Sequence, residues 1–263
     1  MWHNLFLRRG MEDKMVEISA PLIGYPGGKH TISKKLINEF PKEYNKYCEI
    51  FVGGGSVYFR ENKAKERVIN DKSKELIDFY KKFSKTSCSA VRKCEMDLSQ
   101  EQKRNACQNR KKSVCSYLQS SKMSFTGFCE NGFSNTKKRK MSKVKKNCEI
   151  YQEKLRSTKI LNQDWKTVAD KHCTGSKDVC FLDPPYVKKS FKYREEGVTP
   201  KEVCEWANTA KAKVLITYDD RPEVKRACDL KNLHIKKLPI KYSLTTGQLG
   251  HQKRVNELLI KNF

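Results

Sequence analysis

Short apolar runs that end abruptly in glycine, aspartate or proline constrain the fold of this chain most. Runs at residues 47–52, 67–70 and 178–182 end in a triple glycine, in an aspartate and in the sequence Asp-Pro-Pro-Tyr. Apolar runs of this length with such endings are typical of buried strands. Helical patterns, in which apolar residues recur every three or four positions, lie between and after them. This alternation predicts an α/β fold with a mostly parallel sheet.

The expected elements extend along most of the chain outside its middle. Helices are predicted at residues 31–40, around Leu76, Ile77, Phe79 and Tyr80, at 203–212 and at 223–228. Strands are predicted at residues 47–52, 67–70, 178–182, 213–218, 234–240 and 255–260.

Positive charge is concentrated in the middle of the chain. The 263 residues carry a formal net charge of +25, and residues 81–160 alone hold 21 Lys or Arg against 6 Asp or Glu. We predict a basic, mostly helical insert at 85–157 within a domain formed by 21–84 and 158–263, after a poorly ordered lead at 1–20. Such a surplus favours a polyanionic partner, and nucleic acid is preferred to a membrane because no run of about 18 apolar residues occurs.

The cysteines argue against a metal site. The chain contains 11 of them, an odd number with no CxxC pair, so zinc and redox motifs have no support and no metal is expected. The apolar stretch near the N-terminus is too short for a secretion signal, which removes the usual reason to expect disulfides. We therefore predict free thiols in a reducing, cytoplasmic or nuclear compartment, and no secretion.

The triple glycine marks a candidate nucleotide site. A strand, a glycine turn and an acidic residue at the end of the next strand form the nucleotide-binding arrangement of open α/β sheets. Asp71 lies 18 residues after Gly53, close to the usual spacing of about 20. Because the turn lacks the spaced GxGxxG of a phosphate cradle, it favours a nucleoside without a pyrophosphate. Taken alone, a glycine-rich turn after a strand is more often an ordinary turn.

The sequence Asp183-Pro184-Pro185-Tyr186 suits one particular reaction. An aromatic amine is a poor nucleophile because its lone pair is delocalised into the ring. The Asp183 carboxylate and the Pro184 carbonyl can accept the two N–H bonds of such an amine, while Pro185 restricts the peptide and Tyr186 stacks on the base. A base inside a duplex cannot reach this site, so it would have to be flipped out.

These features together resemble a known family. The chain is similar to the Dam-like (D12 class) DNA adenine-N6 methyltransferases, whose cofactor motif precedes the insert and whose catalytic motif follows it. The resemblance rests on Tyr25-Pro26-Gly27-Gly28-Lys29, Phe51-Val52-Gly53-Gly54-Gly55-Ser56, Ile69-Asn70-Asp71, Asp183-Pro184-Pro185-Tyr186 and the tail at residues 256–262. It implies a Rossmann-like fold that binds S-adenosyl-L-methionine (AdoMet), with the insert as the target-recognition region.

The resemblance also implies residue roles. The cofactor-binding residues would be Tyr25, Lys29, Phe51, Gly53, Gly55, Asp71, Asp164 and Asp183. Lys29 would lie near the methionine carboxylate, Asp71 at the ribose hydroxyls and Asp164 near the cofactor's adenine. Asp183 would lie beside both the sulfonium and the target amine, and catalysis would rest on Asp183, Pro184, Pro185 and Tyr186.

The insert is expected to bind DNA, most simply double-stranded DNA. The candidate contacts are Lys122, Asn131, Lys137, Lys138, Arg139 and Lys140. Residues 124–133 faintly resemble the family's recognition hairpin but carry Cys129-Glu130 where many members have an arginine. The recognised sequence therefore does not transfer from the family.

Three other functions stay open at this point. Cytosine-N4 enzymes usually have serine at the position of Asp183, so the aspartate favours adenine. A basic insert does not distinguish DNA from RNA, and a catalytically inactive DNA-binding protein is a further alternative. The sequence leaves the oligomeric state and a restriction-modification partner undetermined.

Overall fold

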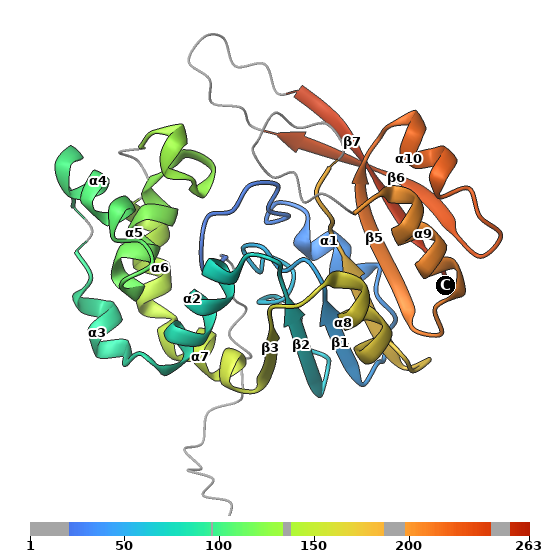
Figure 1. Ribbon diagram of the computed structural model, residues 1–263, viewed down its shortest axis with the longest axis horizontal. Helices are drawn as coiled ribbons and strands as arrows, with labels where there is room; N and C mark the ends of the chain where they lie inside the picture. Colours follow the sequence, from blue (N-terminus) through green and yellow to red (C-terminus); the bar gives the residue numbers. More distant parts are fainter. Residues whose placement is uncertain (1–20, 96, 134–137, 187–197, 243–252) are drawn as a thin grey trace, which may run out of the picture.

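The computed structural model describes residues 21–95, 97–133, 138–186, 198–242 and 253–263. The expected lead at residues 1–20 and the candidate DNA contact Lys137 lie outside the described residues. Figure 1 shows two parts side by side, a sheet with its helices and a group of helices from the middle of the chain. No helix of the described parts is long and apolar enough to cross a bilayer.

The sheet has seven strands in the order β3-β2-β1-β4-β5-β7-β6. The strands are β1 (Lys46–Glu49), β2 (Glu66–Asn70), β3 (Thr158–Leu161), β4 (Asp178–Leu182), β5 (Lys213–Asp219), β6 (His234–Tyr242) and β7 (Lys253–Lys261). The first five in this order run parallel, whereas β7 is antiparallel to both of its neighbours. The predicted α/β fold with a mostly parallel, Rossmann-like sheet is confirmed. The order places the ends of β1 and β4 side by side at the centre, where open sheets bind ligands.

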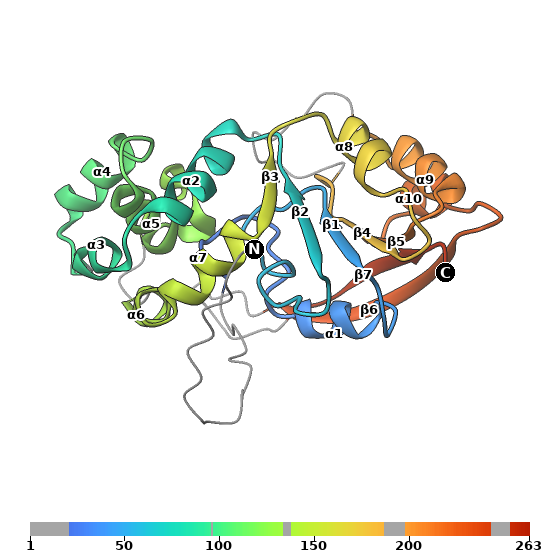
Figure 2. The same ribbon diagram turned by 90° about the horizontal axis from the view of Figure 1, so that it is seen from below.

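Helices cover both faces of the sheet (Figure 2). One buried cluster includes side chains of α8 (Trp165–His172), α9 (Pro200–Thr209) and α10 (Pro222–Ala227), and the other includes side chains of α1 (Ser33–Asn38) and α2 (Lys74–Lys85). Strand β4 is buried along its whole length and alternates between the two clusters. Val179 and Phe181 face the second cluster, and Cys180 and Leu182 face the first. This is the pattern of a parallel strand covered on both faces.

The basic middle of the chain is mostly helical, as expected. Between α2 and β3 lie α3 (Cys88–Lys93), α4 (Gln100–Gln108), α5 (Val114–Met123), α6 (Lys138–Lys146) and α7 (Cys148–Arg156), with two short 3₁₀ turns at Phe125–Gly127 and Cys129–Asn131. Helix α7 returns the chain past α2 to the edge strand β3. We call α3–α7 with these turns the insert.

The insert contacts the segment that precedes α1 through closely packed backbone. The Gly24 N–H donates to Ser121 Oγ (2.9 Å), and the Ser121 hydroxyl donates to the Gly24 carbonyl (3.0 Å). Gly127 has φ +90°, and a Cβ there would lie 2.2 Å from the Gly24 carbonyl oxygen. Only glycine fits this contact, so the insert is held against the segment that leads into Tyr25.

The prediction that Lys122 contacts DNA is wrong. Its side chain is 2% exposed, and Nζ donates to the Pro21 carbonyl (2.6 Å). Helix α5 turns this lysine inward, where its charge is satisfied by backbone rather than by a phosphate. Lys122 therefore fastens the insert to the N-terminal segment.

The prediction of free thiols is also wrong, because the structure pairs ten of the eleven cysteines. The disulfides are Cys88–Cys148, Cys94–Cys115, Cys107–Cys129, Cys173–Cys180 and Cys204–Cys228, which leaves buried Cys48 free. The three bonds in the insert join residues 21 to 60 positions apart, so only the fold brings them together. Disulfides persist in oxidising surroundings, and the argument from cysteines for a reducing compartment therefore no longer holds.

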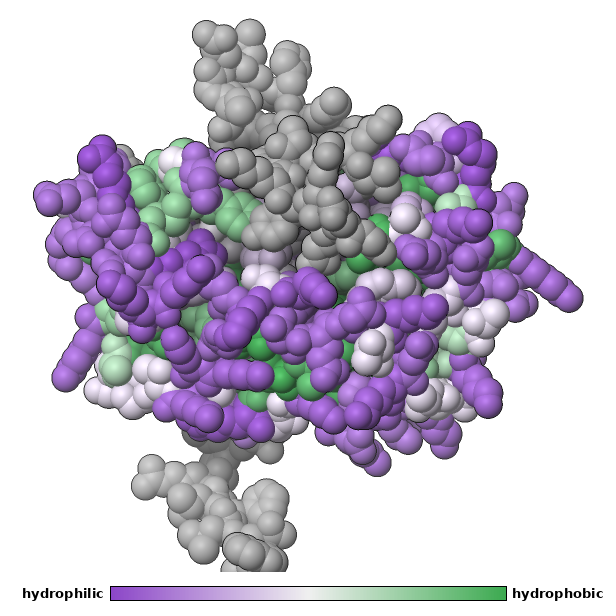
Figure 3. All heavy atoms as spheres, viewed as in Figure 1, coloured by the Kyte–Doolittle hydropathy of each residue, from purple (hydrophilic) through white to green (hydrophobic). Residues whose placement is uncertain are grey.

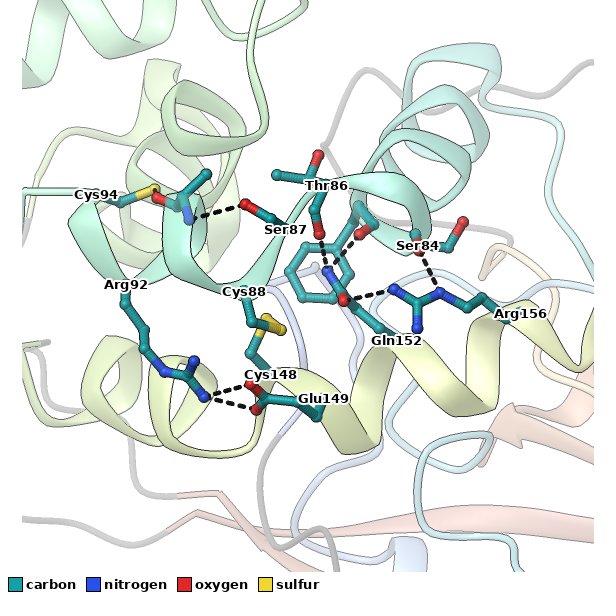
Figure 4. Close-up of a disulfide and its surroundings, with 12 residues drawn as sticks. Ser84, Thr86, Ser87, Cys88, Arg92, Cys94, Cys148, Glu149, Gln152 and Arg156 are labelled. Atoms are coloured by element: carbon teal, nitrogen blue, oxygen red, sulfur yellow. Dashed lines mark hydrogen bonds and ion pairs between the residues drawn. A yellow bond between two sulfur atoms is a disulfide. The ribbon is translucent and has the colours of Figure 1, made fainter. Parts of the chain in front are cut away.

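The Cys88–Cys148 disulfide belongs to a row of contacts along α7 (Figure 4). Cys148, Gln152 and Arg156 are spaced four residues apart and therefore share one face of the helix. Gln152 Nε2 donates to the Phe83 carbonyl (2.8 Å), and Arg156 Nε donates to that of Ser84 (2.8 Å). This face holds α7 against the end of α2 and the start of α3.

Removing the Cys88–Cys148 disulfide should destabilise the protein substantially. It closes a span of 60 residues, and the double substitution Cys88→Ser, Cys148→Ser should lower the free energy of unfolding by about 4 kcal/mol. Urea unfolding of the oxidised protein measures this. The matched control is Cys173→Ser, Cys180→Ser, which opens a span of 7 residues and should cost ~2 kcal/mol. Alkylation of the unfolded, unreduced protein that modifies eleven thiols instead of one would contradict the pairing.

Candidate active site

One cavity at the carboxyl ends of β1 and β4 collects residues from four separated stretches of the sequence. It is lined by Tyr25, Pro26, Gly27, Gly28, Lys29, Glu49, Phe51, Val52, Gly53, Gly54, Ser56, Val57, Asp71, Phe181, Asp183, Pro184, Pro185 and Tyr186. The glycine turn, the acid after β2 and the residues after β4 therefore face the same space. All four predicted catalytic residues belong to this lining, and so do five further predicted cofactor residues, Tyr25, Lys29, Phe51, Gly53 and Asp71.

The glycine turn is fixed by hydrogen bonds on both sides of Gly53. The Gly53 N–H donates to Asp71 Oδ2 (2.9 Å), and the Tyr80 hydroxyl donates to the Gly53 carbonyl (2.6 Å). Gly53 has φ +46°, and a Cβ there would lie 2.9 Å from the Tyr25 ring. The absence of a side chain thus lets Tyr25 pack directly on the turn.

Asp71 connects this turn to the next element. Its carboxylate is 7% exposed and also accepts from the Ser73 N–H (2.9 Å) at the start of α2. Burial raises the pKa of Asp71, while the two backbone N–H donors act in the opposite direction. A carboxylate has about four acceptor positions, so two stay available for hydroxyl groups of a ligand in the cavity.

Asp183 is held from two sides. Lys29 Nζ lies 2.7 Å from Asp183 Oδ1 and 2.8 Å from Oδ2, and Lys29 is itself only 4% exposed. From the neighbouring strand β5, the Thr217 hydroxyl donates to Asp183 Oδ1 (2.7 Å). The carboxylate therefore has a defined orientation before any substrate binds. Sequence reasoning missed Thr217, although it is a polar residue within an otherwise apolar strand.

Two further acids lie close to the Lys29–Asp183 pair. Glu49 lines the cavity at the end of β1 and accepts from the Tyr47 hydroxyl (2.5 Å). Burial, with the charge of Asp183 as a lesser cause, raises the pKa of Glu49 to about 8. Glu257 on β7 is buried and lies 4.0 Å from Lys29 Nζ. Sequence reasoning gave neither acid a role, although Glu257 lies in the tail at residues 256–262 that carries part of the family resemblance.

Aromatic rings complete the walls. Lys29 Nζ lies 5.0 Å from the centre of the Tyr186 ring, within the range of a cation–π contact. Tyr25 packs against Phe128 of the insert with 6.0 Å between ring centres. Phe51 lines the cavity and packs against Trp165 at 6.3 Å. The cavity thus offers flat apolar surfaces beside its charged groups.

Two predicted cofactor residues lie outside the cavity lining. Gly55 faces the interior, where a Cβ would lie 2.8 Å from the Phe59 ring, so this glycine serves packing. Asp164 is exposed and caps α8, accepting from the N–H groups of Lys166 (2.9 Å) and Thr167 (3.2 Å). The structure thus assigns both residues to local structure rather than to the cavity.

Comparison with known families decides what this site belongs to. The model of the family described as D12 class N6 adenine-specific DNA methyltransferase matches residues 25–238. The chain belongs to this family. The D12 match begins at Tyr25 on the cavity wall and extends beyond the Asp183–Tyr186 motif. Family membership makes the protein a methyltransferase and implies AdoMet as the methyl donor.

Solved structures of other methyltransferases are similar at low identity. One is a precorrin-6y C5,15-methyltransferase from Geobacter metallireducens, 7% identical, with 92% of this chain and 98% of that chain covered and a TM-score of 0.44. Another is an rRNA methylase from Streptococcus thermophilus, which is 9% identical. The match covers 88% of this chain and 94% of that chain, with a TM-score of 0.41. A putative RNA methyltransferase from Pyrococcus horikoshii is 11% identical. The match covers 88% of this chain and 80% of that chain, with the same TM-score. At these scores the similarities do not bear on the substrate.

The cavity of this D12 family member fits AdoMet. Gly53 and Gly54 line the cavity, the Asp71 carboxylate has acceptor positions left for hydroxyl groups such as those of a ribose, and Phe51 offers a flat wall for a base. Bound there, AdoMet would supply an electrophilic methyl group on a sulfonium. Asp183 places a carboxylate at the same cavity, which suits a positively charged sulfur.

Asp71→Ala should weaken AdoMet binding, because the variant would lose the predicted ribose acceptor together with the anchor of Gly53. We expect the dissociation constant to rise on the order of tenfold or more, corresponding to the loss of a hydrogen bond to a charged group. Isothermal titration calorimetry measures it.

Asp164→Ala is the matched control for this prediction. It removes an acid from a helix start outside the cavity, costs about 1 kcal/mol of stability and should leave AdoMet affinity unchanged. Equal losses of AdoMet affinity in the two variants would show that Asp164 also belongs to the cofactor site. Unchanged affinity in Asp71→Ala would refute the placement of the ribose.

Proposed function

We propose that the protein transfers a methyl group from AdoMet to the N6 amine of adenine in DNA. The observation that carries this proposal is the convergence of the Asp183–Tyr186 motif, the glycine turn and Asp71 on one cavity. A methyl donor held at the glycine turn would have its reactive end near the residues that suit an amine acceptor. Family membership supports the choice of adenine.

The residues of the chain would act by positioning. Asp183 and the Pro184 carbonyl would each accept one N–H of the amine and so favour a pyramidal nitrogen with an available lone pair. Donors and acceptors that are already oriented cost no reorganisation at the moment of reaction. Lys29 and Thr217 give Asp183 this fixed orientation.

The target base would have to leave its stack to enter this cavity. Tyr186 lies half-buried on the wall beside Asp183, where its ring can stack on a flipped base. Enzymes that act on a base in this way pay an unpairing cost of a few kcal/mol, which stacking and hydrogen bonds offset. The aspartate at position 183 favours adenine over cytosine as the acceptor.

The basic insert supports a nucleic-acid partner. Helix α6 buries Met141 and Val144 and exposes Lys143 and Lys146, while the candidate contacts Lys138, Arg139 and Lys140 occupy its first turn. Asn131 is exposed in the short turn before it. Figure 3 shows hydrophilic residues over much of the described surface on this side, and in the whole chain 55 Lys or Arg stand against 30 Asp or Glu. We propose double-stranded DNA as the partner, in a compartment that gives access to it.

Asp183→Ala should abolish methyl transfer while the protein stays folded. Loss of one preorganised acceptor costs on the order of 10²-fold or more in rate. Transfer of labelled methyl groups to DNA in single-turnover assays measures this. Asp170→Ala is the matched control, because Asp170 is an exposed acid that accepts from Trp206 Nε1 (2.7 Å) on the helical face. A rate for Asp183→Ala within threefold of the wild type would rule out the role.

Neutralising Lys137, Lys138, Arg139 and Lys140 to glutamine should weaken binding to all DNA sequences. Each lost phosphate contact should reduce the slope of log affinity against log salt by about 0.9. Base preference should persist, because phosphate contacts carry no sequence information.

The control removes the same number of positive charges from the side of the molecule that lies away from the insert (Figure 1). Lys166, Lys171, Lys177 and Lys211 are exposed on or beside α8 and α9, and their replacement by glutamine should leave the slope unchanged. If both quadruple variants lose the same affinity, the effect is one of net charge. If the first keeps its affinity and slope, DNA binds elsewhere.

A further inference from the structure

We propose that Thr217 is a positioning residue that orients Asp183 for methyl transfer. The inference rests on the proposed function, because it concerns how the same carboxylate is held. It starts from the small polar side chain of Thr217 in the buried part of strand β5.

Thr217 lies in a place where a hydroxyl needs a partner. Residues 214–218 of β5 are all buried, and Thr217 is 0% exposed among Val, Leu, Ile and Tyr neighbours. An unsatisfied hydroxyl in such surroundings costs on the order of 1–3 kcal/mol, and valine would fill the same space without this cost. The hydroxyl donates to Asp183 Oδ1 at 2.7 Å. This hydrogen bond explains why a threonine rather than a valine occupies the position.

Sheet register brings the two residues together. Leu182 of β4 pairs with Ile216 of β5 in the parallel ladder, so the next residues along, Asp183 and Thr217, project from the same face. On this face Phe181 and Leu215 belong to the buried cluster that also contains α1. The contact is thus built into two neighbouring strands of the sheet, β4 and β5.

The hydroxyl limits how the carboxylate can turn. Lys29 alone approaches both oxygens of Asp183, at 2.7 and 2.8 Å, and a single ammonium permits rotation between them. Thr217 approaches Oδ1 only, so it makes the two oxygens different and leaves Oδ2 as the one with fewer donors. We infer that Oδ2 is the oxygen offered to the target amine.

A misplaced acceptor would reduce the rate more than the affinity. An error of about 1 Å in the position of a catalytic group can cost on the order of 10²-fold in rate. Most contacts to AdoMet and to DNA would come from residues other than Asp183, so their binding should depend on the Thr217 hydroxyl much less than the rate does. This separates positioning from a general loss of structure.

Thr217→Val tests the inference, since it removes the hydroxyl and keeps the shape. We expect kcat for adenine methylation to fall about 10- to 100-fold, with KM for DNA and the AdoMet dissociation constant within twofold of wild type. Thr217→Ser keeps the hydroxyl and should restore kcat to within threefold. Thr167→Val, an exposed threonine of α8, is the matched control and should have no effect.

The outcomes separate this inference from the proposed function. If the wild type methylates adenine and Thr217→Val has kcat within twofold of it, the inference is wrong and the proposed function stands. A kcat for Thr217→Ser as low as that for Thr217→Val also contradicts it. If Thr217→Val does not fold, kcat of Thr217→Ser is compared with kcat of Thr217→Ala. A kcat for Thr217→Ala at least 10-fold lower supports the inference, and equal values contradict it. A wild type that methylates no adenine in any nucleic acid overturns the proposed function itself.

Discussion

A buried ion pair joins the segment that precedes the sheet to the end of its central strand β4. Lys29 is 4% exposed and lies within 2.8 Å of both oxygens of Asp183, with Glu257 a further 4.0 Å contact. Taking charges out of water is costly, and removing one partner leaves the other uncompensated. The pair therefore requires the chain around residues 25–29 to close over β4. That closure is what places Tyr25 on the glycine turn and forms the cavity.

The same N-terminal segment carries the contact with the insert. Gly24 meets Ser121 and Gly127 through backbone-level packing, and it is adjacent to Tyr25 in the cavity wall. Tyr25 in turn touches Phe128 of the insert. The region proposed to bind DNA and the region proposed to bind the methyl donor thus share a stretch of a few residues. A displacement of the insert would be transmitted directly to one wall of the cavity.

The sequence predicted what depends on local pattern and missed what depends on the fold. The strand at 178–182 and the site residues around it were predictable because apolar runs and turn residues are local signals. Strand β3 was not, since it is an edge strand whose residues are only partly buried and show no clear apolar run. The cysteine pairs, buried Lys122 and the Thr217–Asp183 contact share another cause. Each depends on which distant segment lies opposite, and a single sequence does not state this.

The central claim is that the Asp183 cavity directs a methyl group to N6 of adenine. The most direct measurement is nucleoside mass spectrometry of unmethylated DNA after incubation with the protein and isotopically labelled AdoMet. The account predicts labelled N6-methyldeoxyadenosine as the modified nucleoside, in duplex DNA. Label found in N4-methyldeoxycytidine instead, or in RNA but not in DNA, would contradict it.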